Sequence, residues 1–113
     1  MEPVYYRPWG YYTTLLEAPN YKVKKIVVST DKRLSLQYHL HRSEHWTITQ
    51  GTCMVQIGDD FHDLKTNQSF YIPKGVKHRI TNRGTEQVEL IETQIGFCDE
   101  NDIIRLEDDY GRV

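Results

Sequence analysis

Residues 35–46 concentrate side chains that can bind a metal ion or move a proton. The stretch reads SLQYHLHRSEHW and holds three histidines, a glutamine, a glutamate and an arginine. Alternate side chains of a β-strand share one face, so Gln37 and His39 are expected to project together, about 6.6–6.8 Å apart along the backbone. Glu44 follows a turn predicted at LHRS, from which its carboxylate can return toward the same point.

A fourth donor comes later in the chain. His78 follows a turn predicted at IPKG. Gln37, His39, Glu44 and His78 together form a mixed oxygen and nitrogen set without a thiolate, which suits one divalent ion such as Zn²⁺, Mn²⁺, Fe²⁺, Co²⁺ or Ni²⁺. The donor set does not choose among these ions.

Charged neighbours of this set are candidates for catalysis and substrate binding. His41 is the candidate proton shuttle because histidine titrates near neutral pH, although it also fits an alternative ligand or a loop residue. Arg42 can grip a phosphate or a developing oxyanion with two donors, or simply pair with a carboxylate. Lys22, Lys24 and Arg105 are further candidates for the same anion, although the lysines also fit a solvated strand edge.

The elements that must position these residues are short strands. Runs rich in Val, Ile, Thr and Tyr are bounded mostly by Gly, Asn, Asp or Pro, and no apolar repeat at helical spacing persists for three turns. This pattern predicts an all-β double-sheet sandwich or jelly roll. The predicted strands are 21–29, 34–39, 45–49, 52–57, 69–73, 78–82 and 88–96.

Turns and chain ends complete the predicted layout. GDD at 58–60 and NRG at 82–84 are predicted hairpin connections, because Gly and Asn accept positive φ. Residues 7–12 and 100–112 fall outside the strand ladder and are expected to fold over the outside of the sandwich as tails. The whole chain, 1–113, is predicted to be one domain, since 113 residues can bury one modest core.

Composition narrows the partners. The formal charge is −2, from 14 basic and 16 acidic residues, so no strong field would draw the protein to nucleic acid or to an acidic membrane. Cys53 and Cys98 form no Cys-x-x-Cys motif and are expected to be free thiols in a reducing compartment. No apolar run approaches a membrane span, and the start of the chain lacks the pattern of a signal peptide. We expect a soluble cytoplasmic protein.

Two motifs resemble those of the cupin family. The first runs over residues 37–51, with Gln37 where many members have a histidine, and the second runs over residues 67–82, with Asn67 where a glycine is usual. Asn tolerates positive φ well, so that replacement is mild. Together they imply the cupin double-stranded β-helix, a jelly-roll barrel. The motifs are Gln37-x-His39-x4-Glu44-x6-Gly51 and Pro73-x-Gly75-x2-His78-x3-Asn82.

The resemblance extends over roughly residues 7–112. The chain looks like the cupin domain at the C-terminus of type II phosphomannose isomerases, which in bifunctional enzymes follows a mannose-1-phosphate guanylyltransferase domain. This resemblance implies metal-dependent interconversion of mannose 6-phosphate and fructose 6-phosphate. A cation polarising the carbonyl oxygen would stabilise the enediolate of that reaction, and a base would carry the proton between C1 and C2.

Two other functions remain open from the sequence. The first is a non-catalytic metal-binding cupin that binds a sugar phosphate or nucleotide sugar in polysaccharide precursor synthesis. The second is a different cupin reaction, such as oxygen chemistry at iron or epimerisation of a nucleotide-linked sugar. Because small cupins commonly associate through exposed strands, a homodimer is expected, with residues 1–12 and 100–113 crossing to the partner.

Overall fold

The computed structural model describes residues 3–113, and in that range the chain forms strands and turns without a helix. It therefore contains no helix that could cross a membrane in the described range. The all-β prediction is confirmed. The strands are β1 (Val4–Arg7), β2 (Gly10–Ala18), β3 (Tyr21–Val28), β4 (Lys32–Arg33), β5 (Leu36–Tyr38), β6 (Arg42–Gln50), β7 (Thr52–Ile57), β8 (Asp60–Lys65), β9 (Ser69–Ile72), β10 (His78–Asn82), β11 (Val88–Gly96) and β12 (Ile104–Glu107).

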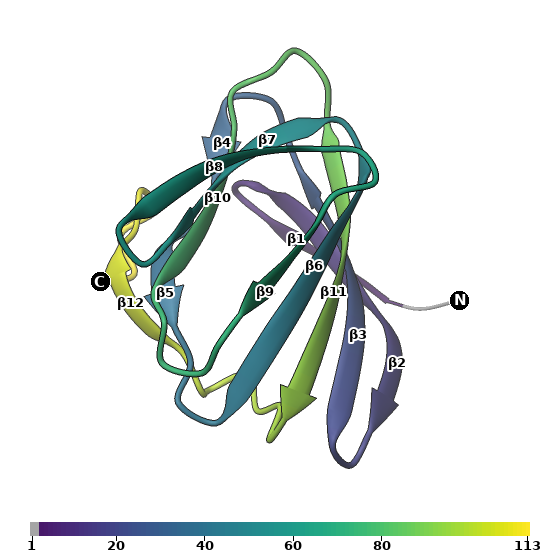
Figure 1. Ribbon diagram of the computed structural model, residues 1–113, viewed down its shortest axis with the longest axis vertical. Helices are drawn as coiled ribbons and strands as arrows, with labels where there is room; N and C mark the ends of the chain where they lie inside the picture. Colours follow the sequence, from purple (N-terminus) through teal and green to yellow (C-terminus); the bar gives the residue numbers. More distant parts are fainter. Residues whose placement is uncertain (1–2) are drawn as a thin grey trace.

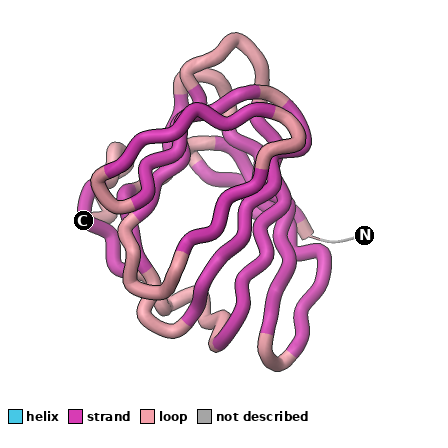
Figure 2. Tube along the Cα trace, viewed as in Figure 1, coloured by secondary structure: helices cyan, strands magenta, loops and turns pink. Residues whose placement is uncertain are grey.

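The strands form two sheets that face each other (Figures 1 and 2). One sheet has the order β1-β2-β3-β11-β6-β9, and the other has β12-β5-β10-β7-β8, with β4 also paired to β10. Neighbours are antiparallel and mostly distant in sequence, as in a jelly roll. This arrangement brings β5, β6 and β10, which carry the predicted ligands, to the same end of the interior.

Strand β6 shows how the sequence divides that interior. Its inward positions are buried in strict alternation, beginning with Arg42 and Glu44 and continuing with Trp46 and Ile48. The first two lie at a polar end of the barrel. The last two join a hydrophobic core in which Leu90 and other aliphatic side chains are fully buried. The apolar end supplies the hydrophobic stabilisation, which leaves the polar end free for a binding site.

The predicted external tails are wrong in the described range. Residues 10–18 form β2, which pairs along β3, and residues 104–107 form β12, which pairs with β5. Both pairings contain a register irregularity, between Thr14 and Leu16 and between Arg105 and Glu107. Such an irregularity interrupts the strict two-residue alternation, so the pattern of these strands was obscured in the sequence.

Three further predictions need correction. Of the predicted strand 34–39 only Leu36–Tyr38 is strand, as β5, and the short β4 precedes it at Lys32–Arg33. Strand β6 begins at Arg42, within the predicted turn LHRS. The NRG segment is not a hairpin, because β10 and β11 belong to different sheets. The solvated-edge alternative for Lys22 and Lys24 is also wrong, since β3 lies between β2 and β11 and both side chains are buried.

Other local predictions are confirmed. Gly58 has φ of 60° in the β7–β8 hairpin, and Asn67 has φ of 80° at the position where the cupin motif usually has glycine.

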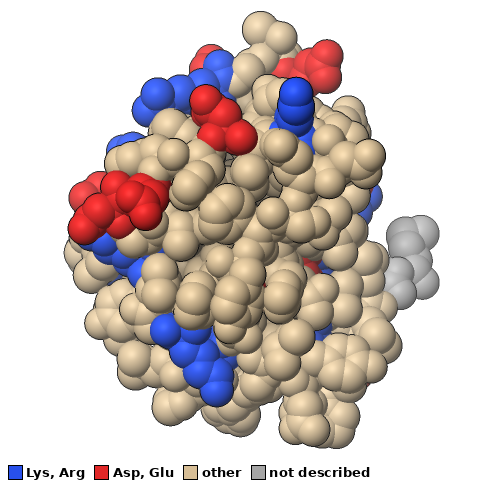
Figure 3. All heavy atoms as spheres, viewed as in Figure 1, with Lys and Arg blue, Asp and Glu red and all other residues tan. Residues whose placement is uncertain are grey.

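On the face shown in Figure 3, cationic and acidic side chains lie in small separate groups around an uncharged centre. Any strongly cationic site on this protein must therefore be sought away from that centre.

Candidate metal centre

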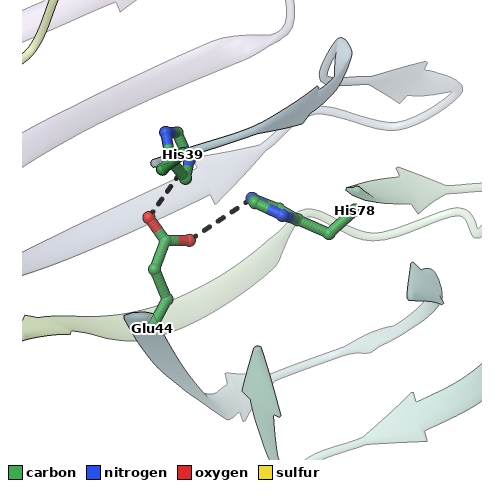
Figure 4. Close-up of side chains that lie close together, drawn as sticks. All are labelled: His39, Glu44 and His78. Carbon is green, nitrogen blue, oxygen red and sulfur yellow. Dashed lines mark ion pairs between the residues drawn. The ribbon is translucent and has the colours of Figure 1, made fainter. Parts of the chain in front are cut away.

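Three predicted ligands meet inside the barrel. Glu44 of β6 lies between His39, which follows β5, and His78, the first residue of β10, and each histidine faces one carboxylate oxygen (Figure 4). The Nε2 atoms of His39 and His78 lie 3.4 and 3.5 Å from those oxygens. One ligand atom from each residue lies within 4.8 Å of the other two, and all three side chains are buried. Separate strands thus converge as the ligand hypothesis requires.

Backbone carbonyls fix the protonation of both rings. Nδ1 of His39 lies 2.6 Å from the carbonyl oxygen of Asp102, and Nδ1 of His78 lies 3.0 Å from that of Val76. Because a carbonyl only accepts, each Nδ1 carries the proton and each Nε2 keeps a lone pair. Carbonyl partners of this kind orient histidines that bind metals.

Burial keeps both imidazoles neutral. It lowers the pKa of His39 to about 4, with the positive charge of Arg42 acting in the same direction. Burial also lowers the pKa of His78. Both rings are therefore in the form that binds metal ions near neutral pH.

The three-residue cluster fits a cation. Nε2 of His78 is buried and has no hydrogen-bond partner among the described residues, and its lone pair faces a carboxylate oxygen. Two acceptors that face each other repel unless a donor or a cation lies between them. Arg42 already donates to Glu44 Oε2 at 2.9 Å and contacts His39 Nε2 at 3.3 Å, so the uncompensated side is that of His78. A cation bound at the cluster would therefore share Glu44 Oε2 and His39 Nε2 with Arg42.

Gln37, the fourth predicted ligand, lies beside this cluster. It is the register partner of His78 across β5 and β10, and its Nε2 lies 3.5 Å from His39 Nε2. Its Oε1 accepts a 2.5 Å hydrogen bond from Ser35 Oγ. A half-turn of the amide would direct Oε1 to the cluster and let the amide nitrogen donate to Ser35. Ligation by Gln37 stays a prediction.

A cavity of about 210 Å³ adjoins the cluster. Gln37 and Arg42 line it, and so do the aromatic side chains of Trp9 and Tyr12. Five cationic side chains and two carboxylates give it a net positive lining. Its walls are Arg7, Trp9, Tyr12, Lys24, Ile26, Leu34, Ser35, Gln37, Arg42, Glu92, Gln94, Glu100, Ile103, Arg105 and Arg112. A small anionic ligand is the chemistry that such walls favour.

The predicted anion-binding lysines are mostly neutralised. Lys24 lines the cavity but lies 2.6 Å from Glu100, whose same oxygen is 3.2 Å from Lys22. Lys22 does not line the cavity, and it also contacts Glu17 at 3.6 Å. Substrate binding by these lysines stays a prediction, which the shared carboxylate weakens.

Arg105 and His41, the other two predicted residues, differ in their position relative to the cavity. Arg105 of β12 lines the cavity and is the register partner of Gln37. His41 is exposed, and its ring lies 6.3 Å from that of Phe97, so the structure brings it neither to the cluster nor to the cavity wall. The assigned proton shuttle is therefore not placed to reach a ligand in this cavity.

Glu92 and Gln94 of β11 were missed by the sequence analysis. Glu92 accepts a 3.2 Å hydrogen bond from Trp46 Nε1 and a 2.5 Å bond from Gln94 Nε2. Burial and then the negative charge of Glu44 raise its pKa. Gln94 Oε1 is buried without a partner in the described chain. The sequence did contain a signal for them. In VELIETQIG, Glu92 and Gln94 occupy the alternating positions that share one face of the strand with Leu90, and that face is buried.

Residues 2–108 match a family model described as Mannose-6-phosphate isomerase C-terminal. The chain belongs to this family. Its sequence is 49% identical to the xanthan biosynthesis protein XanB of Xanthomonas campestris pv. campestris over 109 residues, 96% of this chain and 23% of that protein. It is 43% identical to the mannose-1-phosphate guanylyltransferase ManC of Salmonella typhimurium, again over 96% of this chain and 23% of that protein.

The chain thus spans about a quarter of the length of these curated relatives. Its boundaries as a single domain, 1–113, stay a prediction. The fold resembles that of the capsular polysaccharide assembling protein CapF of Staphylococcus aureus, with a TM-score of 0.84 and 18% identity over 95% of this chain and 34% of that chain. For oxalate decarboxylase of Bacillus subtilis the TM-score is 0.83, over 93% of this chain and 30% of that chain. The cupin fold is confirmed.

The predicted isomerase function is wrong. Relatives that are 43–49% identical are named for mannose-1-phosphate guanylyl transfer or for polysaccharide biosynthesis, and they include the alginate biosynthesis protein AlgA of Pseudomonas aeruginosa at 47% identity. The word isomerase belongs to the description of the family and not to the names of these relatives. The relatives are enzymes, and this chain corresponds to their C-terminal cupin part.

Proposed function

We propose that this chain is a metal-holding cupin module that binds a phosphorylated mannose beside a mannose-1-phosphate guanylyltransferase activity in polysaccharide precursor synthesis. The observation that carries the proposal is the buried cluster of His39, Glu44 and His78, with two fixed Nε2 lone pairs around one carboxylate. The names of the relatives supply the sugar, since they act on mannose 1-phosphate.

The residues present would hold the ion without a thiolate. His39, Glu44 and His78 are the proposed ligands, with Gln37 as a further oxygen donor. A divalent ion bound there would supply a positive centre for a hydroxyl or carbonyl oxygen of the ligand. Arg42 holds the carboxylate of Glu44 in place at 2.9 Å.

The rest of the cavity suits a single sugar ring. Gln94 Oε1, buried without a partner in the described chain, can accept a hydrogen bond from a sugar hydroxyl. Trp9 and Tyr12 provide aromatic surface for the C–H face of the ring. Drug-sized ligands occupy pockets of roughly 300–1,000 Å³. A cavity of about 210 Å³ favours a sugar monophosphate over a complete sugar nucleotide.

Elemental analysis paired with calorimetry tests the proposal. Purified protein loaded with Mn²⁺ or Zn²⁺ and desalted is expected to retain one equivalent of metal and to bind mannose 1-phosphate. Chelation is expected to weaken that binding. His39→Ala is expected to lose the metal.

His45→Ala is the matched control for that variant. His45 lies on the outward face of β6, exposed and beside the ring of Tyr71, so its loss should leave metal content unchanged. Absence of retained metal in the wild-type protein, or equal retention by His39→Ala, would contradict the proposal.

A further inference from the structure

Arg105 presents a buried donor that nothing in the described chain satisfies. Its Nε is inaccessible to solvent and has no hydrogen-bond partner among residues 3–113, and no carboxylate in that range lies within ion-pair distance of its guanidinium. Arginine is among the side chains least often buried without a partner. Because Arg105 lines the cavity, its missing acceptor is best sought in a ligand.

Besides Arg42, which pairs with Glu44, two more arginines line the same cavity. Arg7 donates to the carbonyl oxygen of Tyr6 and lies 3.5 Å from the hydroxyl of Tyr12, and neither partner carries a negative charge. Arg112 forms a two-bond pair with Asp108, at 2.8 and 3.1 Å. The guanidinium groups of Arg7, Arg105 and Arg112 therefore have one ion-paired carboxylate among them, that of Asp108.

The three charges are close enough to act on one another. Burial lowers the pKa of Arg105, and the positive charges of Arg112 and Arg7 lower it further, against the opposing effect of Asp108. Like charges held together are destabilising, and an anion between them would remove the repulsion. A phosphoryl group offers several oxygens to such a cluster, and an arginine fork binds two of them at once.

The sheet places this arginine group beside the metal cluster but separate from it. Register partners join His78 to Gln37 and Gln37 to Arg105, so the three residues form one row across β10, β5 and β12. Neighbouring strands are about 4.8 Å apart, which separates the backbones of the row's two ends by about 10 Å. One sugar ring with a phosphoryl group at one end can lie along such a row.

We propose that Arg105, assisted by Arg7 and Arg112, forms a phosphoryl-binding subsite at the side of the cavity away from the metal cluster. A phosphorylated sugar then binds with its phosphoryl group at these arginines and its hydroxyls directed toward Gln94 and the cluster. The orientation of the sugar rests on the proposed function. The binding of a phosphoryl group by Arg105 does not, because it requires no metal.

The direct test follows the Nε–H resonance of Arg105 by ¹H–¹⁵N NMR in chelator-treated wild-type protein. Titration with inorganic phosphate, and separately with mannose 1-phosphate, is expected to shift this resonance saturably, whereas unphosphorylated mannose is not. An Arg105 resonance that neither phosphorylated probe moves would overturn the subsite, whatever the metal content.

Variants provide the affinity test by calorimetry on the metal-loaded protein. Arg105→Gln should bind mannose 1-phosphate about ten-fold more weakly or worse, because a charge-assisted hydrogen bond is lost. Arg105→Lys should lie between, since it keeps the charge without the fork. The control is Arg83→Gln, which removes one positive charge from an exposed loop outside the cavity. Equal affinities for Arg105→Gln and Arg83→Gln would overturn the proposal.

The two proposals fail in different ways. If the wild-type protein retains no metal but phosphate still shifts Arg105, the metal-holding function fails and the subsite stands. If metal and mannose 1-phosphate bind but Arg105→Gln binds as well as wild type, the subsite fails alone. Because Arg105 makes no side-chain hydrogen bond in the described chain, Arg105→Gln should keep the wild-type unfolding midpoint. Should it not fold, the NMR titration of wild-type protein decides.

Discussion

Replacing His78 by leucine should have opposite effects on the free energy of unfolding in the absence and in the presence of metal. The ring is buried, Nδ1 donates to the carbonyl oxygen of Val76, and Nε2 faces Glu44 without a partner in the described chain. Its edge packs against Trp46 at a centroid distance of 5.5 Å. Leucine has a similar size and retains apolar packing, and it removes both polar nitrogens.

The magnitudes predict opposite effects with and without metal. An unsatisfied buried polar group costs about 1–3 kcal/mol, and one hydrogen bond contributes about 1 kcal/mol. Without metal, His78→Leu should therefore be as stable as wild type or more stable, by up to about 2 kcal/mol. Glu44 Oε1 remains bonded to Trp46 Nε1 at 3.2 Å in either case. With metal at a hundred times its dissociation constant, wild type should gain about 2.7 kcal/mol, and the variant should lose most of that gain.

Urea denaturation in chelator measures the stability change caused by the replacement alone. Repeating it in excess Mn²⁺ or Zn²⁺ measures the stability gained from metal binding. The control is His45→Leu, the same replacement on the outward face of β6, which should keep the full metal-dependent gain. An equal gain for His78→Leu and wild type would refute the assignment of His78 as a ligand. A loss of more than about 2 kcal/mol by the metal-free variant would refute the argument that its Nε2 is strained by lacking a partner.

Three further predictions concern the scaffold. Asn82 donates to the carbonyl oxygens of Val28 and Glu86 and accepts from the Gly84 amide, so Asn82→Ala should lower the free energy of unfolding by about 2–4 kcal/mol in chemical denaturation; a loss below about 1 kcal/mol would contradict this. Arg112 hydrogen bonds lower the pKa of Asp108 to about 2, so this carboxylate stabilises the fold above pH 4 and loses that contribution as the pH falls toward 2. Because Arg112 is one-third exposed, we expect about 1 kcal/mol or less, absent in Asp108→Asn. Light scattering should give twice the chain mass, since β1 is a sheet edge with exposed apolar side chains, and a 13.4 kDa particle would contradict the dimer.

Much of the barrel was predictable because several of its strands are short runs rich in Val, Ile and Thr that are bounded by turn residues. The predicted strands 52–57, 78–82 and 88–96 coincide with β7, β10 and β11. The outer strands were not recognised, because β2 and β12 contain register irregularities and expose several apolar residues. The pairing of β12 with β5 also depends on contacts distant in sequence, which the local pattern does not encode.

The candidate site was predictable in part for a similar reason. His39, Glu44 and His78 follow from motif spacing, and the structure places their ligand atoms together. The exposed position of His41 depends on where β6 begins, and the predicted turn placed that start too late. Arg7 and Arg105 reach the same cavity because β1 pairs with β2 and β12 pairs with β5. Both arginines lie in segments that were predicted to be tails, so their meeting could not be foreseen.

The most direct test of the account is an anomalous-difference map from crystals grown with Mn²⁺ or Co²⁺. We predict one strong peak inside the barrel, within coordination distance of Nε2 of His39, Nε2 of His78 and a carboxylate oxygen of Glu44. A map with full anomalous signal elsewhere, or with none at this cluster in metal-saturated crystals, would contradict the claim that these three side chains hold a cation.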